Sequence, residues 1–262
     1  MADLRFVDLS VPIQEPVPGE LEGDLAVALA AKIEYQDHTQ SVPQASTILG
    51  CEPSDFPEGL AWGNESVTLS THSGTHMDAP WHYFPTSGGE PAKTVDQIPL
   101  EDCFGPGVVL DLTGRERGER VDVDAVQAAV EKTGQPLAPK EIVLLRYGYD
   151  RGFGTPSYWS EYPGLTGDAT RWIIEQGVKV IGTDAVGFDR DFASIKADFE
   201  RTGDRSLLWE AHRVGIDLEY FQIEKLANLD KLPMRGFTVA CFPIKVTGAS
   251  AGWVRAVAII GL

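Results

Sequence analysis

The sequence predicts an α/β fold, organised as a single domain over residues 1–262 with a mixed β-sheet core and flanking helices. Strand and helix patterns alternate in the middle of the chain, and strand patterns cluster towards both ends. We find no internal repeat and no linker-like stretch that would divide the chain. With 262 residues, of which 43% are hydrophobic and 23% charged, the chain is long enough to build one substantial core.

The N-terminal quarter of the chain contains few regular patterns. Residues 5–11 alternate as a short strand that ends at Pro12, and residues 12–24 have the composition of a loop. Residues 25–33 fit either a strand or a short helix. Residues 36–63 are rich in proline and glycine and show no period, which predicts a long irregular excursion, a kind of loop that is uncommon unless it covers something.

The elements of the predicted core follow from residue 65 onwards. Residues 65–71 alternate as a strand and lead directly into a histidine-rich segment. Apolar runs predict further strands, and amphipathic runs that begin at a capping residue and stop at glycine predict helices. The further strands are 106–112, 141–147, 178–183, 237–241, 245–247 and 254–260, and the helices are 122–133 and 167–176. Residues 189–206 are charged and less patterned.

The charge and the cysteine content exclude several classes of partner. The net charge is −17, and a surface this negative repels nucleic acids and anionic lipids. The three cysteines are widely spaced and do not indicate a disulfide scaffold or a cysteine zinc site. No signal peptide and no apolar stretch of ~18 residues is present, so we expect a soluble cytoplasmic protein.

Four potential metal ligands lie within one short segment: His72, His76, Asp78 and His82. All four have the same parity in the sequence, so in an extended chain their side chains would point to one face. A helix would scatter them, and Pro80 also opposes a helix. Imidazole and carboxylate groups suit zinc, manganese or iron, so we predict a metal site on this segment in an extended conformation.

The segment His72-Ser-Gly-Thr-His76-Met-Asp78-Ala-Pro-Trp-His82 resembles the signature of the cyclase family that contains the bacterial kynurenine formamidases and the isatin hydrolases. Further parts of the sequence look like later blocks of that family, and they are residues 164–166, 180–184, 223–229 and 243–259. The resemblance therefore covers nearly the whole chain. It implies the family's swivelling β/β/α-like fold and metal-dependent hydrolysis of an amide, lactam or related carbonyl bond.

The resemblance also implies which residues hold the metal. His72, His76 and Asp78 match the ligands of a first ion, and Asp78 would bridge to a second. The family holds the second ion with a later histidine and a glutamate twelve residues apart, and His212 and Glu224 have that separation. The implied cofactor is a divalent metal, Zn²⁺ or Mn²⁺, present as one or two ions.

His82 matches the general acid/base histidine of the family. In the implied reaction the metal lowers the pKa of bound water from ~15.7 toward ~7 and polarises the substrate carbonyl. His82 then passes a proton to the departing nitrogen, a task that suits a group titrating near neutrality. The resemblance also implies a homo-oligomer, either a dimer or a tetramer.

The expected substrate is a small, ring-bearing molecule such as an aryl formamide or an isatin-like lactam. The chain lacks the tryptophan that kynurenine formamidases carry near their N-terminal strand, which argues against N-formylkynurenine itself. By parity, Trp81 and Tyr83 would face away from the metal. Trp62 and Phe84 are therefore our candidates for the wall of an apolar substrate pocket.

Two other functions are compatible with the residues alone. His76, Asp78 and His212 have the composition of the 2-His-1-carboxylate triad of an iron oxygenase, although this leaves His72 and His82 without a role. A non-catalytic protein could instead use the metal for stability or binding. Dependence on O₂ would identify the oxygenase, and a closed site with four protein ligands would identify the structural role.

Overall fold

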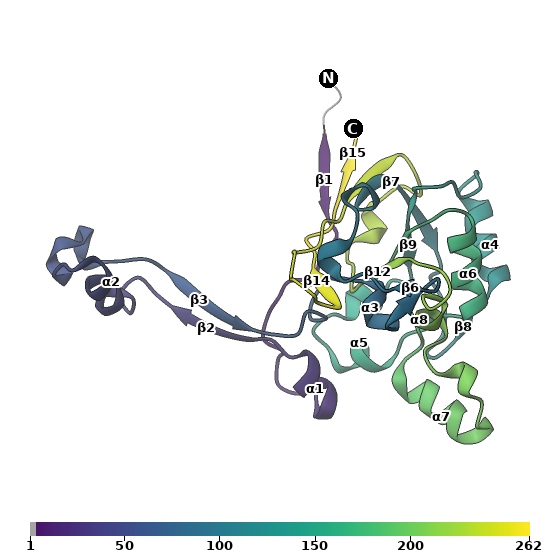
Figure 1. Ribbon diagram of the computed structural model, residues 1–262, viewed down its shortest axis with the longest axis horizontal. Coiled ribbons are helices and arrows are strands. Elements are labelled where there is room, and N and C mark those ends of the chain that lie inside the picture. The colour runs from purple at the N-terminus through teal and green to yellow at the C-terminus, as the bar shows by residue number, and fades with distance from the viewer. Residues whose placement is uncertain (1–3) are drawn as a thin grey trace.

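The computed structural model describes residues 4–262 and has a nine-stranded mixed sheet at its centre (Figure 1). Four neighbouring strands are parallel, and each strand outside this block is antiparallel to its neighbour. The order across the sheet is β1 (Arg5–Asp8), β15 (Val257–Ile260), β13 (Phe237–Ala240), β7 (Phe104–Asp111), β9 (Ile142–Arg146), β11 (Val180–Thr183), β12 (Phe221–Glu224), β4 (His76–Asp78) and β14 (Ala251–Trp253). The α/β fold with a mixed sheet is confirmed.

The central strands are buried on both faces, which is why they read as continuous apolar runs in the sequence. Alternate residues of β7 divide between two cores. Val108 and Leu110 pack in the core beneath the helices, and Val109 packs in the core on the opposite face. Loops and short 3-10 turns cover that second face, with Ile98 and Leu229 packed into it.

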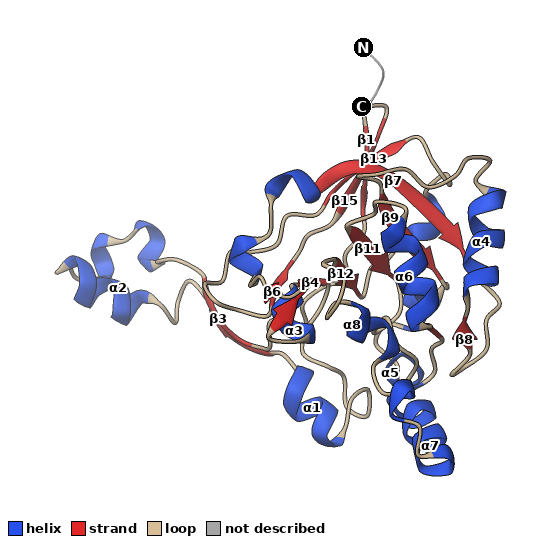
Figure 2. Cartoon of the chain, turned by 45° about the vertical axis from the view of Figure 1, so that its right-hand side comes forward, coloured by secondary structure: helices blue, strands red, loops and turns tan. Residues whose placement is uncertain are grey.

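Two amphipathic helices cover the first face of the sheet, α4 (Val123–Lys132) and α6 (Gly167–Glu175), and they lie side by side in Figure 2. Both begin where a side chain caps the first turn. Asp122 accepts a hydrogen bond from the backbone N–H of Ala125, and Thr166 caps α6 in the same way. Both predicted helices are confirmed within two residues at each end.

Residues 32–68 form an arm that projects from the body of the molecule (Figures 1 and 2). Its two strands, β2 (Lys32–Gln36) and β3 (Asn64–Thr68), pair antiparallel. Its tip holds α2 (Val42–Leu49) and two short 3-10 turns. The prediction of an irregular excursion is wrong for α2, because its proline lies in the first helical turn and its glycine ends it, positions where both residues favour a helix boundary.

Several further predictions need correction. Residues 189–206 contain the helix α7 (Phe192–Thr202), which begins at a capping Asp191. Residues 245–247 form no strand, and the predicted strand 254–260 begins only at Val257. The strand predicted at 65–71 extends only to Thr68, the last residue of β3, and the chain turns from Thr71 onwards.

The remaining elements are short. They are α1 (Gly23–Leu29), α3 (Pro80–Tyr83), α5 (Pro156–Ser160), α8 (Glu210–Val214), and the strand pairs β5 (Thr86–Ser87) with β6 (Glu90–Pro91) and β8 (Arg120–Val121) with β10 (Gly164–Leu165). The helical alternative for residues 25–33 is thus correct as far as residue 29. Over residues 4–262, none of the helices combines the length and the apolar composition needed to cross a membrane.

Candidate metal centre

Three consecutive elements carry the histidine-rich segment. His72 lies in a turn, His76 and Asp78 lie on β4, and His82 lies on α3. The prediction of one extended segment is therefore correct for β4 and wrong on both sides of it. Parity within the sequence does not explain how these side chains meet.

A turn before β4 and a helical turn after it bring the imidazoles together. Gly74 adopts a left-handed conformation (φ +62°), which reverses the chain, and Pro80 lies in the first turn of α3. The ring centroid of His72 lies 5.1 Å from that of His76 and 4.2 Å from that of His82. The predicted convergence is present, but a different backbone path produces it.

Asp78 lies at the centre of the cluster. Its Oδ1 is 2.9 Å from Nδ1 of His72 and 3.3 Å from Nε2 of His76. Glu224, at the end of the neighbouring strand β12, adds a second carboxylate, whose Oε2 lies 3.4 Å from Nε2 of His76. The pairing of β12 with β4 therefore brings a residue from late in the chain to the histidine segment.

Buried polar atoms in this cluster lack the partners that burial normally requires. His76 and Asp78 are fully buried, and neither Nε2 of His76 nor either carboxylate oxygen of Asp78 has a hydrogen bond of good geometry among the described residues. Burial raises the pKa of Asp78, but the imidazoles of His76, His82 and His72 outweigh it and hold that pKa well below its usual range. An ionised, buried carboxylate without donors fits a cation between these side chains.

His72 and His76 each use one ring nitrogen for orientation and turn the other inwards. Nδ1 of His76 donates to the carbonyl oxygen of Gly74 at 3.0 Å, which leaves Nε2 as a free acceptor. Nε2 of His72 lies 3.0 Å from Oγ of Ser250, which leaves Nδ1 facing Asp78. Such outer hydrogen bonds are typical of histidines that ligate metals.

His212 also uses one ring nitrogen for orientation and turns the other towards the site. It lies on α8, where Nδ1 donates to the carboxylate of Asp189 and Nε2 faces Oε1 of Glu224 at 3.9 Å. Burial by itself lowers the pKa of His212, but the hydrogen bond and the charge of Asp189 raise it above its ordinary value. Asp189 was not predicted, because nothing in the sequence connects the loop after β11 with α8.

The ligand atoms fall into two overlapping groups, in each of which all atoms lie within 4.8 Å of one another. One group contains His72, Asp78 and His82, and the other contains His76, Asp78 and Glu224. The structure thus brings together His72, His76, Asp78 and Glu224, with Asp78 shared between both groups. His212 belongs to neither group and faces only Glu224, at 3.9 Å. The structure also places His82, expected beside the metal, at the distance of a ligand.

The sequence model of the family described as "Putative cyclase" matches residues 7–190, well over half of the chain. The chain belongs to the cyclase family. Similar proteins include the isatin hydrolase of Roseibium aggregatum, 24% identical over 204 residues, which cover 74% of this chain and 73% of that protein. A kynurenine formamidase of Erythrobacter litoralis is 27% identical over 192 residues, covering 73% and 74%.

The fold agrees with this assignment. A solved structure of isatin hydrolase A from Labrenzia aggregata, bound to benzyl benzoate, superimposes with a TM-score of 0.76 at 23% sequence identity. The superposition covers 99% of this chain and 94% of that one. The resemblance expected from the histidine signature is confirmed, and the cyclase-family fold extends over the full described chain.

A cavity of about 300 Å³ opens beside the cyclase-family histidines. Its apolar wall is formed by α1 and by side chains from three later segments, namely Leu25, Leu29, Val186, Phe192 and Trp209. Neither Trp62 nor Phe84 lines it, which corrects our candidates for the pocket wall. Trp62 lies in the arm, and α3 turns Phe84 out towards solvent, where parity had placed it inward.

Two further residues at this cavity have backbones that bulky side chains rarely adopt. Trp209 (φ +58°) stacks on His212 at a centroid distance of 4.7 Å and lies 5.4 Å from His82. Lys225 (φ +58°) is buried, and its Nζ donates to the carbonyl oxygen of His72 at 3.3 Å and lies 3.5 Å from Glu224. Left-handed conformations of this kind cluster at functional sites. No sequence pattern indicates them.

The environment of His82 keeps its imidazole neutral. Burial lowers the pKa of His82 to about 3, and the nearby imidazoles of His212, His72 and His76 add to this effect against the attraction of Asp78. A neutral imidazole in the lining of the cavity leaves a ring nitrogen free to accept a proton, but a pKa of about 3 lies below the near-neutral value expected from the sequence and makes His82 a weak base at neutral pH.

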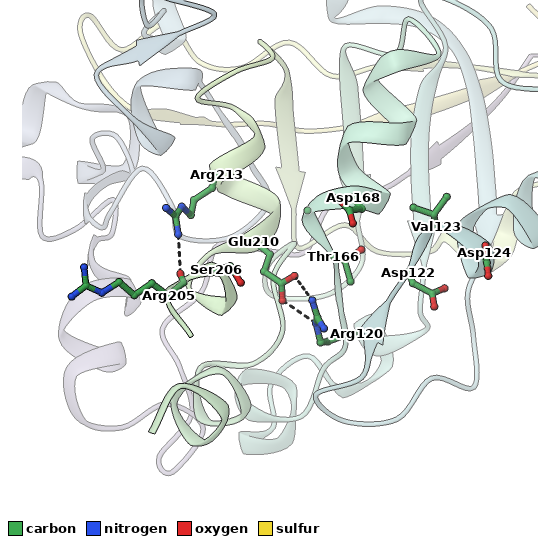
Figure 3. A pocket seen from close by; sticks show the side chains of 11 residues that line it. Arg120, Asp122, Val123, Asp124, Thr166, Asp168, Arg205, Ser206, Glu210 and Arg213 are labelled. Carbon is green, nitrogen blue, oxygen red and sulfur yellow. Dashed lines mark hydrogen bonds and ion pairs between the residues drawn. The ribbon is translucent and has the colours of Figure 1, made fainter. Parts of the chain in front are cut away.

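A larger cavity of about 690 Å³ lies elsewhere, between α4, α6 and α8 (Figure 3). Several of its charged side chains already have hydrogen-bond partners. Arg120 forms two hydrogen bonds with Glu210, Arg213 donates to the carbonyl oxygen of Arg205, and Asp122 caps α4. No imidazole lines this cavity, so its size does not make it a competing active site.

Proposed function

We propose that this chain is a metal-dependent hydrolase that cleaves an amide, lactam or related carbonyl bond in a small aromatic substrate. The observation that carries the proposal is the buried carboxylate of Asp78. It lacks hydrogen bonds, it is shared by two groups of ligand atoms, and it lies beside a cavity with an apolar wall. The relatives, whose names are isatin hydrolase and kynurenine formamidase, support the reaction class.

The proposed metal ligands are His72, His76, Asp78, His212 and Glu224. A divalent ion held there, Zn²⁺ or Mn²⁺, would activate water and polarise a carbonyl oxygen. Two ions are compatible with the overlapping groups of ligand atoms, because Asp78 belongs to both groups.

The other side chains of the cavity bind and orient the substrate. His82 is the proposed catalytic residue, which accepts a proton from the nucleophile and returns it to the departing nitrogen. Leu25 and Leu29 of α1, with Phe192 and Trp209, exclude water and provide flat apolar contacts for an aromatic ring. An aryl formamide or an isatin-like lactam is small enough for a cavity of about 300 Å³.

We further propose that the protein acts as one domain, in the cytoplasm and as a homo-oligomer. The three cysteines, none of which forms a disulfide in the described chain, suit a reducing compartment. The exposed apolar side chains of the arm, which include Tyr35, Ile48 and Leu49, support an oligomer.

Metal analysis followed by a hydrolysis screen tests the proposed function. Purified protein is expected to contain about one or two equivalents of zinc or manganese, and to hydrolyse aryl formamides, isatin-like lactams or lactones without O₂. Turnover that requires O₂ would indicate the iron oxygenase instead. A bound metal closed by four protein ligands, with no hydrolysis across the screen, would indicate the structural role.

Replacing Asp189 by asparagine tests how His212 is held. The amide cannot supply the charge that stabilises the Nδ1–H of His212, so we expect metal affinity to fall roughly 10–100-fold, as for other outer partners of metal-bound histidines. Titration with Zn²⁺ against a competing chelator measures the change. Asp124→Asn, on the exposed surface of α4, is the matched control and should leave the affinity unchanged.

Substitutions of Trp209 distinguish the contribution of its ring from the cost of its left-handed backbone. Both Trp209→Ala and Trp209→Gly remove the ring and should lower kcat/KM about 10-fold, whereas Trp209→Phe should retain most of it. Only glycine relieves the left-handed backbone, so the glycine variant should be more stable than the alanine variant by about 1 kcal/mol. Full activity in both small variants would show that the ring only fills space.

A further inference from the structure

A lysine lies among the proposed metal ligands. Lys225 directly follows Glu224 at the end of β12, and its side chain is only 2% exposed. Its Nζ donates to the carbonyl oxygen of His72 at 3.3 Å and lies 3.5 Å from Oε2 of Glu224. Of the lysines that the structure describes, only Lys225 is buried. Since a buried ammonium is costly unless it is paired, its place beside Glu224 requires a reason.

The backbone fixes where this ammonium lies. The N–H of Lys225 donates to the carbonyl oxygen of Ala185 at 3.0 Å, and its own carbonyl oxygen accepts a hydrogen bond from the hydroxyl of Thr75. Its φ of +58° is unfavourable for a lysine and persists only where the surroundings impose it. The packing therefore holds the side chain inside the site, although lysine normally reaches solvent.

Glu224 lies between this lysine and two imidazoles. Its Oε2 is 3.4 Å from Nε2 of His76 and 3.5 Å from Nζ of Lys225, and its Oε1 is 3.9 Å from Nε2 of His212. A carboxylate that ligates a metal commonly has an outer hydrogen-bond partner that orients it. Lys225 is such a partner for Glu224, and it also brings a positive charge to the site.

The buried charges of the site balance with one divalent ion. Three carboxylates contact the imidazoles of the cluster, those of Asp78, Glu224 and Asp189, and each carries one negative charge. The ammonium of Lys225 together with one divalent ion offsets all three. A second divalent ion would leave two positive charges without a partner. Buried charges are weakly screened, so their repulsion opposes binding of that ion.

We propose that the ammonium of Lys225 replaces a second cation and makes this site a centre for one divalent ion. Lys225 is a positioning residue, because it orients Glu224 and sets the charge of the site through it. The two groups of ligand atoms that share Asp78 then hold a single ion between them. The inference rests on the proposed function, and it narrows the occupancy of the site from one or two ions to one.

Titration of the metal-free protein with Mn²⁺ tests the proposal. Electron paramagnetic resonance distinguishes a single Mn²⁺ ion from two neighbouring ions, because the spins of neighbouring ions couple. We expect one equivalent and an uncoupled signal for the unmodified chain. Lys225→Met keeps the apolar stem and removes the charge, so this variant should bind a second equivalent with coupled spins. That second ion should bind at least ~10²-fold more tightly than any second ion in the unmodified chain.

Two further variants serve as controls. Lys196→Met makes the same change at a side chain of α7 that is 75% exposed, and it should still bind one equivalent. Lys225→Asn removes the charge with a residue that tolerates a left-handed backbone, so it should bind two equivalents even where the Lys225→Met variant does not fold.

Three outcomes would contradict the inference. Two tightly bound equivalents in the unmodified chain would show that Lys225 does not exclude a second ion. A single equivalent in both charge-free variants, with the circular dichroism of the unmodified chain, would show that the lysine has only a structural role. An unmodified chain that binds no Mn²⁺ and no Zn²⁺ would overturn the proposed function, and this inference with it.

Discussion

Replacing Asp78 by asparagine is expected to abolish metal binding and, with it, hydrolysis. The amide keeps the size of the side chain but removes the charge that both groups of ligand atoms share. We expect metal affinity to fall by more than ~10²-fold, beyond the loss caused by changing an outer partner. Activity should fall by roughly 10³-fold or more, because the activated water and the polarised carbonyl are lost together.

Thermal unfolding gives a readout of the same variant that does not depend on a substrate. A ligand that binds only the folded state stabilises it by about 2.7 kcal/mol at a concentration one hundred times its dissociation constant. Added Zn²⁺ or Mn²⁺ should therefore raise the Tm of the wild-type chain and of the Asp124→Asn control, but not that of Asp78→Asn. An equal rise in all three would show that the ion binds elsewhere.

The sequence predicts the core of this fold well because its signals are local. Apolar runs define the strands β7, β9 and β11, and capping residues define α4 and α6. The arm was not predicted as a unit. A strand was expected where β3 lies, but β2 is short and most of its side chains are exposed, so the pairing of the two strands left no clear pattern. The helix α2 was missed because its proline and its glycine suggested a loop, whereas they lie at the two ends of the helix.

The chemistry of the site was predictable, but its geometry was not. Histidines and an aspartate close together in sequence identify the ligand types, whatever the backbone does between them. The convergence itself depends on Gly74 in a left-handed turn and on the single helical turn that begins at Pro80. His212 and Glu224 were identified only through the family resemblance, since α8 and β12 have no strong pattern of their own.

The residues that orient the ligands left no signal in the sequence. Asp189 reaches His212 across a loop, and the left-handed conformations of Trp209 and Lys225 are imposed by packing rather than by residue type. Tyr83, which parity had turned away from the metal, instead lies against the rings of His82 and His212, since it belongs to the helix α3. Long-range contacts of this kind require coordinates.

Replacing His82 by alanine is expected to lower kcat roughly 10²–10⁴-fold while the metal stays bound, which is the effect of losing a general acid/base. The neutral imidazole of His82 accepts the proton of the nucleophile, and alanine offers no acceptor. Because burial lowers the pKa of His82 to about 3, wild-type kcat should not lose this base until the pH falls well below 6.5. Initial rates across pH, with metal content measured on the same samples, check both statements.

The metal content of the His82 variant decides between two roles that the geometry allows. His82 shares a group of ligand atoms with His72 and Asp78, so its nitrogen is close enough to ligate an ion as well as to move a proton. If alanine at this position removes metal together with activity, His82 is a ligand and another group must transfer the proton. Retained metal, a lost rate and no rescue by added Zn²⁺ or Mn²⁺ would leave proton transfer as its role, because a ligand defect is reversed by excess ion.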